Sequence, residues 1–189
     1  GAFKSKTELA VNDESGKETE SIKAKYFIIA TGARPRQLPG LEIDGTMIID
    51  SEKAMTLESQ PKKMVIVGAG AIGVEFAYFY NTLGTDVTIV ELQKTLVPVE
   101  DKDVGRELGK IYKKKGMTLM LESTVEKVTK KGKGVEVTVN TKKGAQTIEA
   151  DVVLSAVGVT GNVEGLGLEE IGVKVDRGAI VVDKSTYST

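Results

Sequence analysis

The sequence predicts an α/β protein with a Rossmann-like βαβαβ parallel sheet and an antiparallel β-meander. Three observations support this fold class. A continuous apolar run of strand length leads into a GxGxxG turn at residues 64–73, and a helical pattern follows it. A second strand, a second helical pattern and a third strand come next along the chain. Beyond residue 124, apolar residues alternate with polar ones, which is typical of antiparallel strands.

The glycine turn after the first of these strands predicts a dinucleotide site. Gly68 allows the tight turn, Gly70 lets backbone N–H groups approach a pyrophosphate, and Gly73 lets the helix lie close to the strand. The N-terminus of the helix adds partial positive charge and free N–H donors. The alternative is a βαβ unit whose glycines serve only its turns and which binds no nucleotide.

The helix after this turn is expected to end at Gly84. Its predicted buried face consists of apolar residues at helical spacing: Ile72, Phe76, Phe79, Tyr80 and Leu83. The next strand, Asp86 to Val90, ends in Glu91, close to the offset of about 20 residues expected for a carboxylate that binds an adenosine ribose. A carboxylate accepts hydrogen bonds from the ribose 2′-OH and repels a 2′-phosphate, and no arginine follows directly. NAD is therefore preferred over NADP.

Strands and a linker are expected before the glycine turn. Gly1 to Val11 and Ser21 to Ile29 are predicted strands of an antiparallel meander, joined by a polar turn from Asn12 to Glu20. The second strand runs into Thr31-Gly32, which places a hydroxyl and unshielded N–H groups at the carboxyl end of a strand, where ligands bind in such sheets. An ordinary strand exit is the alternative. Prolines and glycines between residues 35 and 45 then predict a passage from one domain to another.

Two further helices complete the helical prediction. Ser51 is expected to cap a short helix that runs through Leu57. The second long helix begins near Asp101 and Asp103, whose charges suit a first turn, and ends at Gly116. Its predicted apolar face consists of Val104, Leu108, Ile111 and Tyr112.

The remaining strands follow in order. Met117 to Met120 completes βαβαβ, and alternation at Val125 to Val128 and Val135 to Val139 predicts an antiparallel hairpin or meander. Asp151 to Ala156 is a further buried strand that leads to Gly158. Gly178 to Asp183 is expected to form a last short strand.

Composition excludes several classes of function. The chain has 189 residues, of which 26 are basic and 27 acidic, so no global field attracts nucleic acid or an acidic membrane. The lysine runs at Lys113–Lys115 and Lys130–Lys133 are interpreted as solvated faces at a helix end and a turn. No apolar run reaches about 18 residues and no basic leader precedes one, so we expect neither a transmembrane helix nor a signal peptide.

Cysteine and histidine are both absent. The lack of cysteine excludes disulfides and thiolate metal sites and fits a cytoplasmic protein. The lack of histidine excludes imidazole catalysis and His-ligated metals within this chain. No catalytic residue and no metal site are therefore expected in it, and part of the chemistry must lie elsewhere.

An ordered set of motifs carries a family resemblance. In chain order these are Ala30-Thr31-Gly32-Ala33-Arg34-Pro35, GxGxxG with Glu75, then Glu91, Ser155-Ala156-Val157-Gly158 and Gly167-Leu168-Glu169-Glu170. Together they resemble the flavin-dependent pyridine nucleotide–disulfide oxidoreductases over essentially the whole chain. Within this family, residues 73–76, 97–103 and 167–172 are most similar to the dihydrolipoamide dehydrogenase branch.

The resemblance implies an NAD domain inserted in the middle of an FAD domain. Residues 46–155 match the NAD-binding insert, and residues 1–45 and 156–189 match pieces of the FAD domain that flank it. The FAD-binding glycine motif, the redox-active cysteine pair, the Gly-Asp FAD motif and the dimer domain with its His-Glu pair have no match in this sequence. The chain thus resembles a fragment of such an enzyme and is expected to be inactive alone.

The resemblance also implies site residues. NAD contacts are implied for Gly68, Ala69, Gly70, Ala71, Ile72, Gly73, Val74, Glu75, Glu91, Val125 and Gly158, and FAD contacts for Thr31, Gly32 and Ala33. Val125 would pack near the adenine and Gly158 near the nicotinamide half. Glu75 would lie between nicotinamide and flavin; the alternative is a first-turn carboxylate favoured by the helix dipole. The family usually has Arg-x-Pro-Asn after the glycine that matches Gly158. Here Val159-Thr160-Gly161-Asn162 follows, and only Asn162 matches.

The implied function is the NAD-binding part of a dihydrolipoamide dehydrogenase, which orients nicotinamide to receive hydride from reduced FAD. The whole protein would be a homodimer within a 2-oxo acid dehydrogenase complex, with neither nucleic acid nor membrane as a partner. Two alternatives stay open. One is another family member, such as a mercuric reductase, a soluble transhydrogenase or an NADH oxidase; the other is a stand-alone, non-catalytic dinucleotide-binding module.

Overall fold

The computed structural model describes residues 1–189 and divides them into two compact units. One unit comprises Gly1–Arg34 and Val159–Thr189, and the other comprises Pro35–Gly158. The boundary at residues 34 and 35 precedes the expected one at 45 and 46. Residues 35–45 pack into the second unit because Leu41 is buried in its core and the Gly40 carbonyl accepts a hydrogen bond from Val128 N–H. The assignment of the units to FAD and NAD domains stays a prediction.

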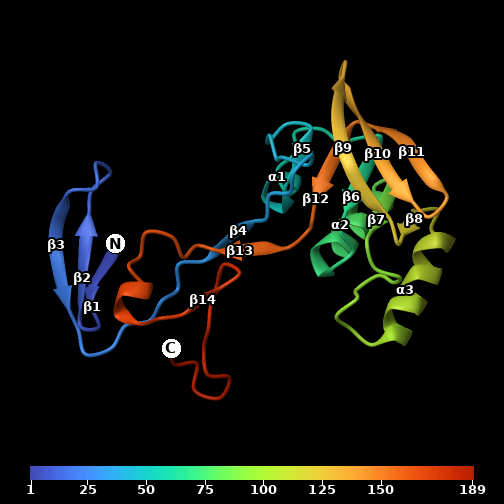
Figure 1. Ribbon diagram of the computed structural model, residues 1–189. Coiled ribbons are helices and arrows are strands. Elements are labelled where there is room, and N and C mark those ends of the chain that lie inside the picture. The colour runs from blue at the N-terminus through green and yellow to red at the C-terminus, as the bar shows by residue number, and fades with distance from the viewer. The chain divides into compact units, whose positions relative to one another are not determined.

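The Pro35–Gly158 unit is built on a five-stranded sheet in the order β5-β12-β6-β7-β8, and every neighbouring pair is parallel. Its strands are β5 (Ile48–Ile49), β6 (Lys63–Val67), β7 (Asp86–Glu91), β8 (Thr118–Leu121) and β12 (Val152–Ser155). The helices are α1 (Ser51–Ala54), α2 (Ala71–Thr82) and α3 (Lys102–Lys114). The predicted α/β class and the run β6-α2-β7-α3-β8 are confirmed (Figure 1).

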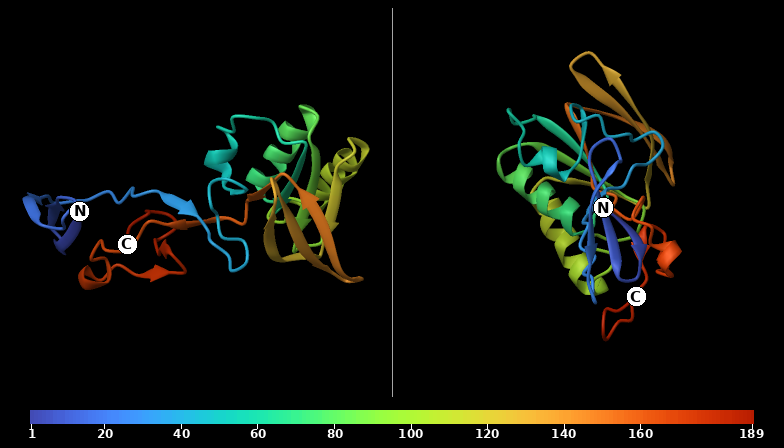
Figure 2. Two further views of the ribbon diagram at one scale, coloured as in Figure 1. Left: turned by 90° about the horizontal axis from the view of Figure 1, so that it is seen from above. Right: turned by 90° about the vertical axis from the view of Figure 1, so that its left-hand side faces the viewer.

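The expected antiparallel meander is also present. It consists of β9 (Thr124–Lys131), β10 (Gly134–Thr141) and β11 (Gly144–Ala150), in the order β11-β10-β9. Figure 2 shows these strands on one side of the parallel sheet and the helices α2 and α3 on the other. The unit therefore has three layers, and both faces of the parallel sheet are covered, as is usual for such sheets.

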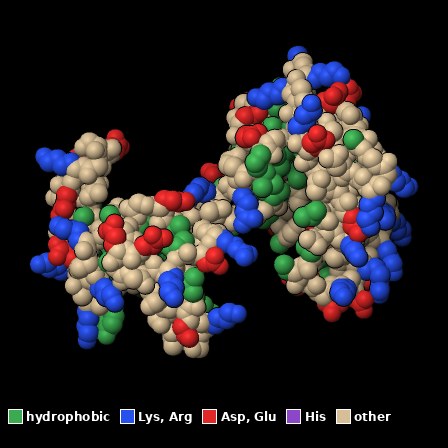
Figure 3. Space-filling model, in the orientation of Figure 1, with side chains coloured by type: hydrophobic (Ala, Val, Ile, Leu, Met, Phe, Trp, Pro, Cys, Tyr) green, Lys and Arg blue, Asp and Glu red, His purple; other side chains and the backbone are tan.

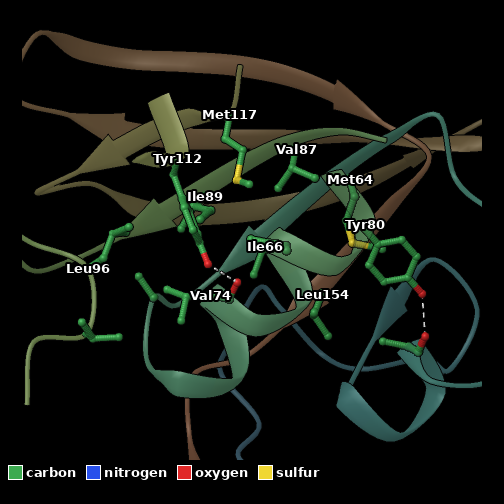
Figure 4. Close-up of a cluster of buried hydrophobic side chains, with 14 of the residues drawn as sticks. Met64, Ile66, Val74, Tyr80, Val87, Ile89, Leu96, Tyr112, Met117 and Leu154 are labelled. Atoms are coloured by element: carbon green, nitrogen blue, oxygen red, sulfur yellow. Dashed lines mark hydrogen bonds between the residues drawn. The ribbon is translucent and has the colours of Figure 1, made fainter. Parts of the chain in front are cut away.

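Each face of the parallel sheet has its own core. In β6, Met64 and Ile66 point to the helices, whereas Val65 and Val67 point to the meander, because side chains alternate along a strand. In the helical core, the Tyr112 hydroxyl donates to the Val74 carbonyl at 2.7 Å and the Tyr80 hydroxyl donates to the Ala54 carbonyl (Figure 4). Both buried hydroxyls are thus satisfied while their rings fill the core.

The predicted buried face of α2 was largely wrong. The buried residues are Gly73, Val74, Ala77 and Tyr80, while Ile72, Phe79 and Leu83 are exposed and Phe76 is only partly buried. Small residues decide which face packs, because a side chain at Gly73 would overlap the Gly68 carbonyl. The helix approaches the strand through these small residues, and the larger apolar side chains lie outside the contact.

The predicted face of α3 was half wrong, in the same way as that of α2. Tyr112 and Leu108 pack on the core, whereas Val104 and Ile111 are exposed. Gly105 is buried in their place, because a Cβ there would overlap the Thr95 hydroxyl and the Leu96 carbonyl.

The expected starts and ends of the two long helices are confirmed. Asp101 caps α3 by accepting a hydrogen bond from Asp103 N–H, and Gly84 and Gly116 follow α2 and α3 with positive φ. For α1, Asp50 rather than Ser51 is the N-cap, and this helix ends at Ala54 rather than Leu57.

In the Gly1–Arg34 and Val159–Thr189 unit, the expected first strand is a hairpin. β1 (Ala2–Ser5), β2 (Glu8–Asn12) and β3 (Glu18–Lys23) form an antiparallel sheet, so the meander is confirmed with one more turn than predicted. The strand expected from Ser21 to Ile29 is cut short: it ends at Lys23, Ile28 is 96% exposed, and no strand pairs with residues 24–32. An apolar pattern forms a strand only where another strand supplies backbone partners.

The rest of this unit is short and irregular. β13 (Val159–Gly161) pairs with β4 (Ala33–Pro35), and β14 (Val175–Asp176) pairs with β15 (Ala179–Ile180). A 3₁₀ turn, η1 (Glu169–Ile171), lies between them. The strand expected from Gly178 to Asp183 is therefore reduced to two residues. Phe3, Leu168 and Val173 form the small core, with the Phe3 and Phe27 rings in an edge-to-face contact.

The two lysine runs lie where the sequence suggested. Figure 3 shows basic side chains over α3, which ends at Lys113–Lys115, and near the β9–β10 hairpin, whose turn carries Lys130–Lys133. These lysines are exposed. No helix has the length and apolarity needed to span a bilayer.

Two buried hydroxyls differ in their partners, and this predicts opposite effects on stability. The Thr85 hydroxyl donates to the Pro61 carbonyl at 2.8 Å, whereas the Ser155 hydroxyl is buried without a hydrogen-bond partner. Thr85→Val is expected to lower the free energy of unfolding by about 1–2 kcal/mol, because it leaves a buried carbonyl unpaired. Ser155→Ala is expected to leave it unchanged or raise it by about 1 kcal/mol. Urea unfolding measures both; an equal loss in the two variants would contradict the assignment for Ser155.

Candidate functional site

A cleft of about 650 Å³ opens where the strands β6, β7 and β12 end. All the residues that line it belong to the Pro35–Gly158 unit: Arg36, Leu38, Pro39, Leu41, Val67, Gly68, Gly70, Ala71, Ile72, Val90, Glu91, Leu92, Ser123, Thr124, Val125, Ala156, Val157 and Gly158. The carboxyl ends of parallel strands are where ligands bind in open α/β sheets. The cleft thus lies where the glycine turn predicted a site.

The three glycines of the turn differ in their surroundings. Gly68 has φ +100°, and a Cβ there would overlap the Ala156 carbonyl. A Cβ on Gly73 would overlap the Gly68 carbonyl. At Gly70 nothing lies within 4 Å of the Cβ position. Two glycines therefore serve the packing of the turn, and Gly70 alone leaves open space in front of the backbone.

The N-terminus of α2 faces this open space. Gly70 is the N-cap and supplies no side-chain hydrogen bond, so the N–H groups of the first turn have no capping partner. Ala71 and Ile72, the first two residues of α2, line the cleft. Unpaired N–H groups together with the positive end of the helix dipole form a site suited to a phosphate group.

Glu91 is hydrogen-bonded to the backbone of the glycine turn, and the sequence analysis did not predict this contact. Its Oε2 accepts a hydrogen bond from Ala69 N–H at 2.6 Å, and its Oε1 accepts one from Gln93 N–H at 2.7 Å. The side chain is only 8% exposed, yet it lines the cleft. A carboxylate oxygen has two acceptor positions, so Glu91 keeps capacity for a ligand hydroxyl while it holds the turn.

Ala69 is also held through its carbonyl, by Val97, a residue with a strained backbone. The Ala69 carbonyl accepts a hydrogen bond from Val97 N–H at 2.8 Å, and Val97 has φ +42°. A β-branched residue in this region costs about 1–3 kcal/mol and persists only where its surroundings impose it. Ala69 is fully buried between Glu91 and the Val97 loop. It therefore supports the turn from behind and does not line the cleft.

The remaining predicted nucleotide residues divide into two groups. Val125 lines the cleft, and Gly158 does so with φ +99° and open space at its Cβ position. Val74 is buried in the core, and Glu75 is exposed on α2 outside the cleft lining. Burial, and after it the Glu75 carboxylate, raises the pKa of Tyr112. The role of Glu75 between nicotinamide and flavin stays a prediction.

The Thr31-Gly32 turn lies in the other unit and is bound by Asn162. The Thr31 hydroxyl donates to the Asn162 carbonyl at 2.7 Å, and Asn162 Nδ2 donates to the Thr31 carbonyl at 3.1 Å. Asn162 N–H donates to the Gly32 carbonyl at 3.0 Å. The asparagine that matches the family motif thus fixes the shape of the turn that the sequence assigned to flavin contact.

The side chain of Asn162 is itself held by a hydrogen bond from Arg34. Arg34 Nη1 donates to Asn162 Oδ1 at 3.0 Å, and the guanidinium forms a two-pronged ion pair with the Glu164 carboxylate at 2.6 and 3.0 Å. This contact lowers the pKa of Glu164 to about 2. Ala33, between Arg34 and Gly32, begins β4.

Several cleft residues were missed by the sequence analysis. Ser123 and Thr124 follow β8, so the rule that ligands bind at carboxyl strand ends indicates them. Arg36, Leu38 and Pro39 come from the linker before the sheet, and no local pattern marks them as part of a site. The packing of Leu41, the Gly40 hydrogen bond and the hydrogen bond from Arg36 N–H to the Gly158 carbonyl bring that linker to the cleft.

Comparison with protein-family models decides the family. The model described as pyridine nucleotide-disulphide oxidoreductase matches residues 2–189. The chain belongs to this family. The expected resemblance to it is confirmed, and the family fits a cleft built on a glycine turn.

Relatives of this disulphide oxidoreductase chain include dihydrolipoyl dehydrogenases. That of Rhizobium etli is 47% identical over 161 residues, which cover 85% of this chain and 34% of the relative. That of Zymomonas mobilis is 38% identical over 184 residues, which cover 97% of this chain and 39% of the relative. The resemblance to the dihydrolipoyl dehydrogenase branch is therefore confirmed. The chain spans about a third to two fifths of the length of these relatives.

Solved structures of the family share the fold. The crystal structure of LpdA from Mycobacterium tuberculosis has a TM-score of 0.82 and 33% identity, over 93% of this chain and 38% of that chain. The HOCl-induced flavoprotein disulfide reductase RclA from Escherichia coli has a TM-score of 0.81 and 29% identity, over 100% of this chain and 42% of that chain. The α/β fold of the family is thus the fold of this chain.

The different surroundings of the glycines predict different effects of adding one methyl group. Gly73→Ala is expected to lower the free energy of unfolding by about 2 kcal/mol or more, because the new Cβ meets the Gly68 backbone. Gly70→Ala is expected to keep or slightly raise stability, since φ is −69° and the space is open. Urea unfolding of the two variants measures this. Comparable losses would show that Gly70 also packs against the chain.

The ion pair of Arg34 and Glu164 predicts a pH dependence. The folded-state pKa of Glu164 is lowered from 4.5 to about 2, so its stabilising effect is complete above pH 4.5 and is lost as the pH falls toward 2. Both side chains are about half exposed, so the effect on stability is small. NMR titration of the Glu164 carboxyl is expected to show this low pKa, and Arg34→Gln is expected to return it toward 4.5. Arg106→Gln, which removes the same charge from α3, should leave it unchanged; an equal shift in both variants would contradict the pairing.

Proposed function

We propose that the Pro35–Gly158 unit is the NAD-binding part of a flavin-dependent dihydrolipoyl dehydrogenase. The observation that carries this proposal is the cleft itself. It combines an open glycine, an uncapped helix N-terminus and a buried carboxylate at the end of the second strand of a βαβ unit. These are the groups that receive the pyrophosphate and the adenosine ribose of a dinucleotide. The cleft volume also falls within the range of small-molecule sites, about 300–1,000 Å³.

Each residue has a part in this proposal. Gly70, Ala71 and Ile72 present the N–H groups that bind the pyrophosphate, and Glu91 accepts hydrogen bonds from the adenosine ribose. Val125 packs at the adenosine side, and Gly158 leaves room for the nicotinamide half because it carries no side chain. Since Glu91 is fixed by two backbone N–H groups, its charge cannot move away from a 2′-phosphate. This favours NAD over NADP.

FAD is the second cofactor in the proposal. Thr31, Gly32 and Ala33 are proposed to contact it, and Asn162 fits this role because it fixes the turn while leaving these residues exposed. The flavin and nicotinamide supply the hydride chemistry, and this chain's residues bind and orient them. Dimer formation and assembly in a 2-oxo acid dehydrogenase complex are proposed for the whole protein. The cytoplasmic location expected from the absence of cysteine stays a prediction.

A stand-alone dinucleotide-binding module is a second candidate. The observation in its favour is that the cleft is lined entirely by one compact unit. Such a module would bind the nucleotide without transferring electrons. Both candidates require the same binding event, and they differ in whether the whole protein has dihydrolipoamide-dependent NAD reduction.

Calorimetric titration of the chain with NADH and NADPH tests the proposal. Saturable NADH binding with weaker NADPH binding is expected, because Glu91 repels a 2′-phosphate. Glu91→Gln is expected to weaken NADH binding about tenfold, since it removes the charge and leaves Ala69 N–H or Gln93 N–H facing an amide NH2 that cannot accept a hydrogen bond. Glu100→Gln, an exposed change of the same kind outside the cleft, serves as the control. Circular dichroism confirms that each variant is folded.

Two outcomes would contradict this assignment. If NADPH bound as well as NADH, the role given to Glu91 would be wrong and an NADP-linked relative would be favoured. If neither nucleotide bound to the folded chain, the cleft would not be a dinucleotide site by itself.

A further inference from the structure

One basic residue, Arg36, lines the cleft. Among the lining residues Arg36 is the only cation and Glu91 the only anion. The other arginines each have a carboxylate within ion-pair distance: Arg34 pairs with Glu164, Arg106 with Asp103 and Arg177 with Asp176. Arg36 has no such partner in the structure. Arg36 is exposed where it lines the cleft, and an unpaired guanidinium there is available for an anionic ligand.

The backbone fixes Arg36 at one end of the cleft. Its N–H donates to the Gly158 carbonyl at 3.0 Å. Farther along, the Gly40 carbonyl accepts from Val128 N–H, and Leu41 is only 2% exposed in the core beneath the meander. Pro35 and Pro39, on either side of Arg36, restrict the backbone further. The segment is thus held on both sides of Arg36.

Sheet order places Arg36 relative to the phosphate site. The strands run β12-β6-β7, with the glycine turn after β6, Glu91 at the end of β7 and Gly158 just beyond β12. Because β6 lies between β12 and β7, Arg36, which is held at Gly158, and Glu91 lie on opposite sides of the glycine turn. A dinucleotide with its ribose at Glu91 and its pyrophosphate at the turn directs its other half toward Gly158 and Arg36.

We propose that Arg36 is a dinucleotide-binding residue whose guanidinium contacts the pyrophosphate of NAD(H) from the nicotinamide side. This rests on the proposed function of the cleft. The pyrophosphate carries two negative charges, whereas a helix N-terminus supplies the equivalent of only about half a positive charge. Arg36 supplies a full charge and N–H donors whose planar arrangement matches two phosphate oxygens. It thereby complements the N-terminus of α2 and offsets the nearby carboxylate of Glu91.

The experiment compares the chain with Arg36→Met, Arg36→Lys and Arg106→Met. NADH and adenosine 5′-monophosphate are the probes, each titrated at low and high NaCl by calorimetry or NMR. Arg106→Met removes the same charge from α3, outside the cleft, and is therefore the matched control. Circular dichroism and thermal unfolding show whether each variant keeps the fold.

Arg36→Met is expected to weaken NADH binding about tenfold and to flatten its dependence on NaCl, because a charge-assisted contact is lost. Arg36→Lys should fall between this variant and the original chain, since it keeps the charge without the planar donors. Adenosine 5′-monophosphate does not extend to the nicotinamide side, so its affinity should stay within about twofold in all variants. Arg106→Met should bind both probes as the original chain does.

Equal NADH affinity in Arg36→Met and the original chain would overturn the role of Arg36 and leave the proposed function intact. A parallel loss of adenosine 5′-monophosphate affinity would also overturn it, because the effect would then act through the adenosine side or the fold. If the original chain bound no NADH, the proposed function would fail, and the role of Arg36 would fail with it.

Discussion

The hydrogen bond from Ala69 N–H to the Glu91 carboxylate is the interaction on which the site depends. It joins the turn after β6 to the end of β7, and it is buried. A buried carboxylate needs hydrogen-bond donors, and Glu91 finds two in backbone N–H groups. The turn in return gains a partner for the buried Ala69 N–H, which would otherwise have no acceptor. One side chain thus satisfies its own charge, shapes the turn and faces the space that a ligand would fill.

Close backbone contacts complete this arrangement. Gly68 meets the Ala156 carbonyl and Gly73 meets Gly68, so β6, α2 and the end of β12 approach to distances that a Cβ would prevent. Val97 adds a hydrogen bond to Ala69 from a strained backbone, which the packing of Leu96 under α3 supports. The result is a closely packed turn in which Gly70 leaves open space. A site that binds a flexible dinucleotide gains affinity when its own groups are already fixed.

The unit of Gly1–Arg34 and Val159–Thr189 uses polar contacts where the Pro35–Gly158 unit uses close packing. Its core is small, and the Thr31-Gly32 turn is fixed by hydrogen bonds to Asn162 rather than by buried side chains. Arg34 and Glu164 hold Asn162 from the other side. Val159 is 53% exposed where the family usually has arginine, and Gly161 lies so close to the Gly178 carbonyl that a Cβ would be 2.6 Å away. The departure from the family motif therefore coincides with a close backbone contact between β13 and the turn before β15.

The sequence by itself determined the βαβαβ run along the chain, the glycine turn and the ends of the long helices. These features depend on local periodicity and on residues such as Gly84, Asp101 and Gly116, whose effects act within a few positions. Only the tertiary structure decided which faces of α2 and α3 are buried, because that depends on how closely Gly73 and Gly105 let each helix approach its neighbours. It also decided that residues 24–32 form no strand, since no partner strand lies beside them. The hydrogen bond between Ala69 and Glu91 joins segments far apart in the chain, and so does the packing that brings Arg36 to the cleft. No local pattern specifies such contacts.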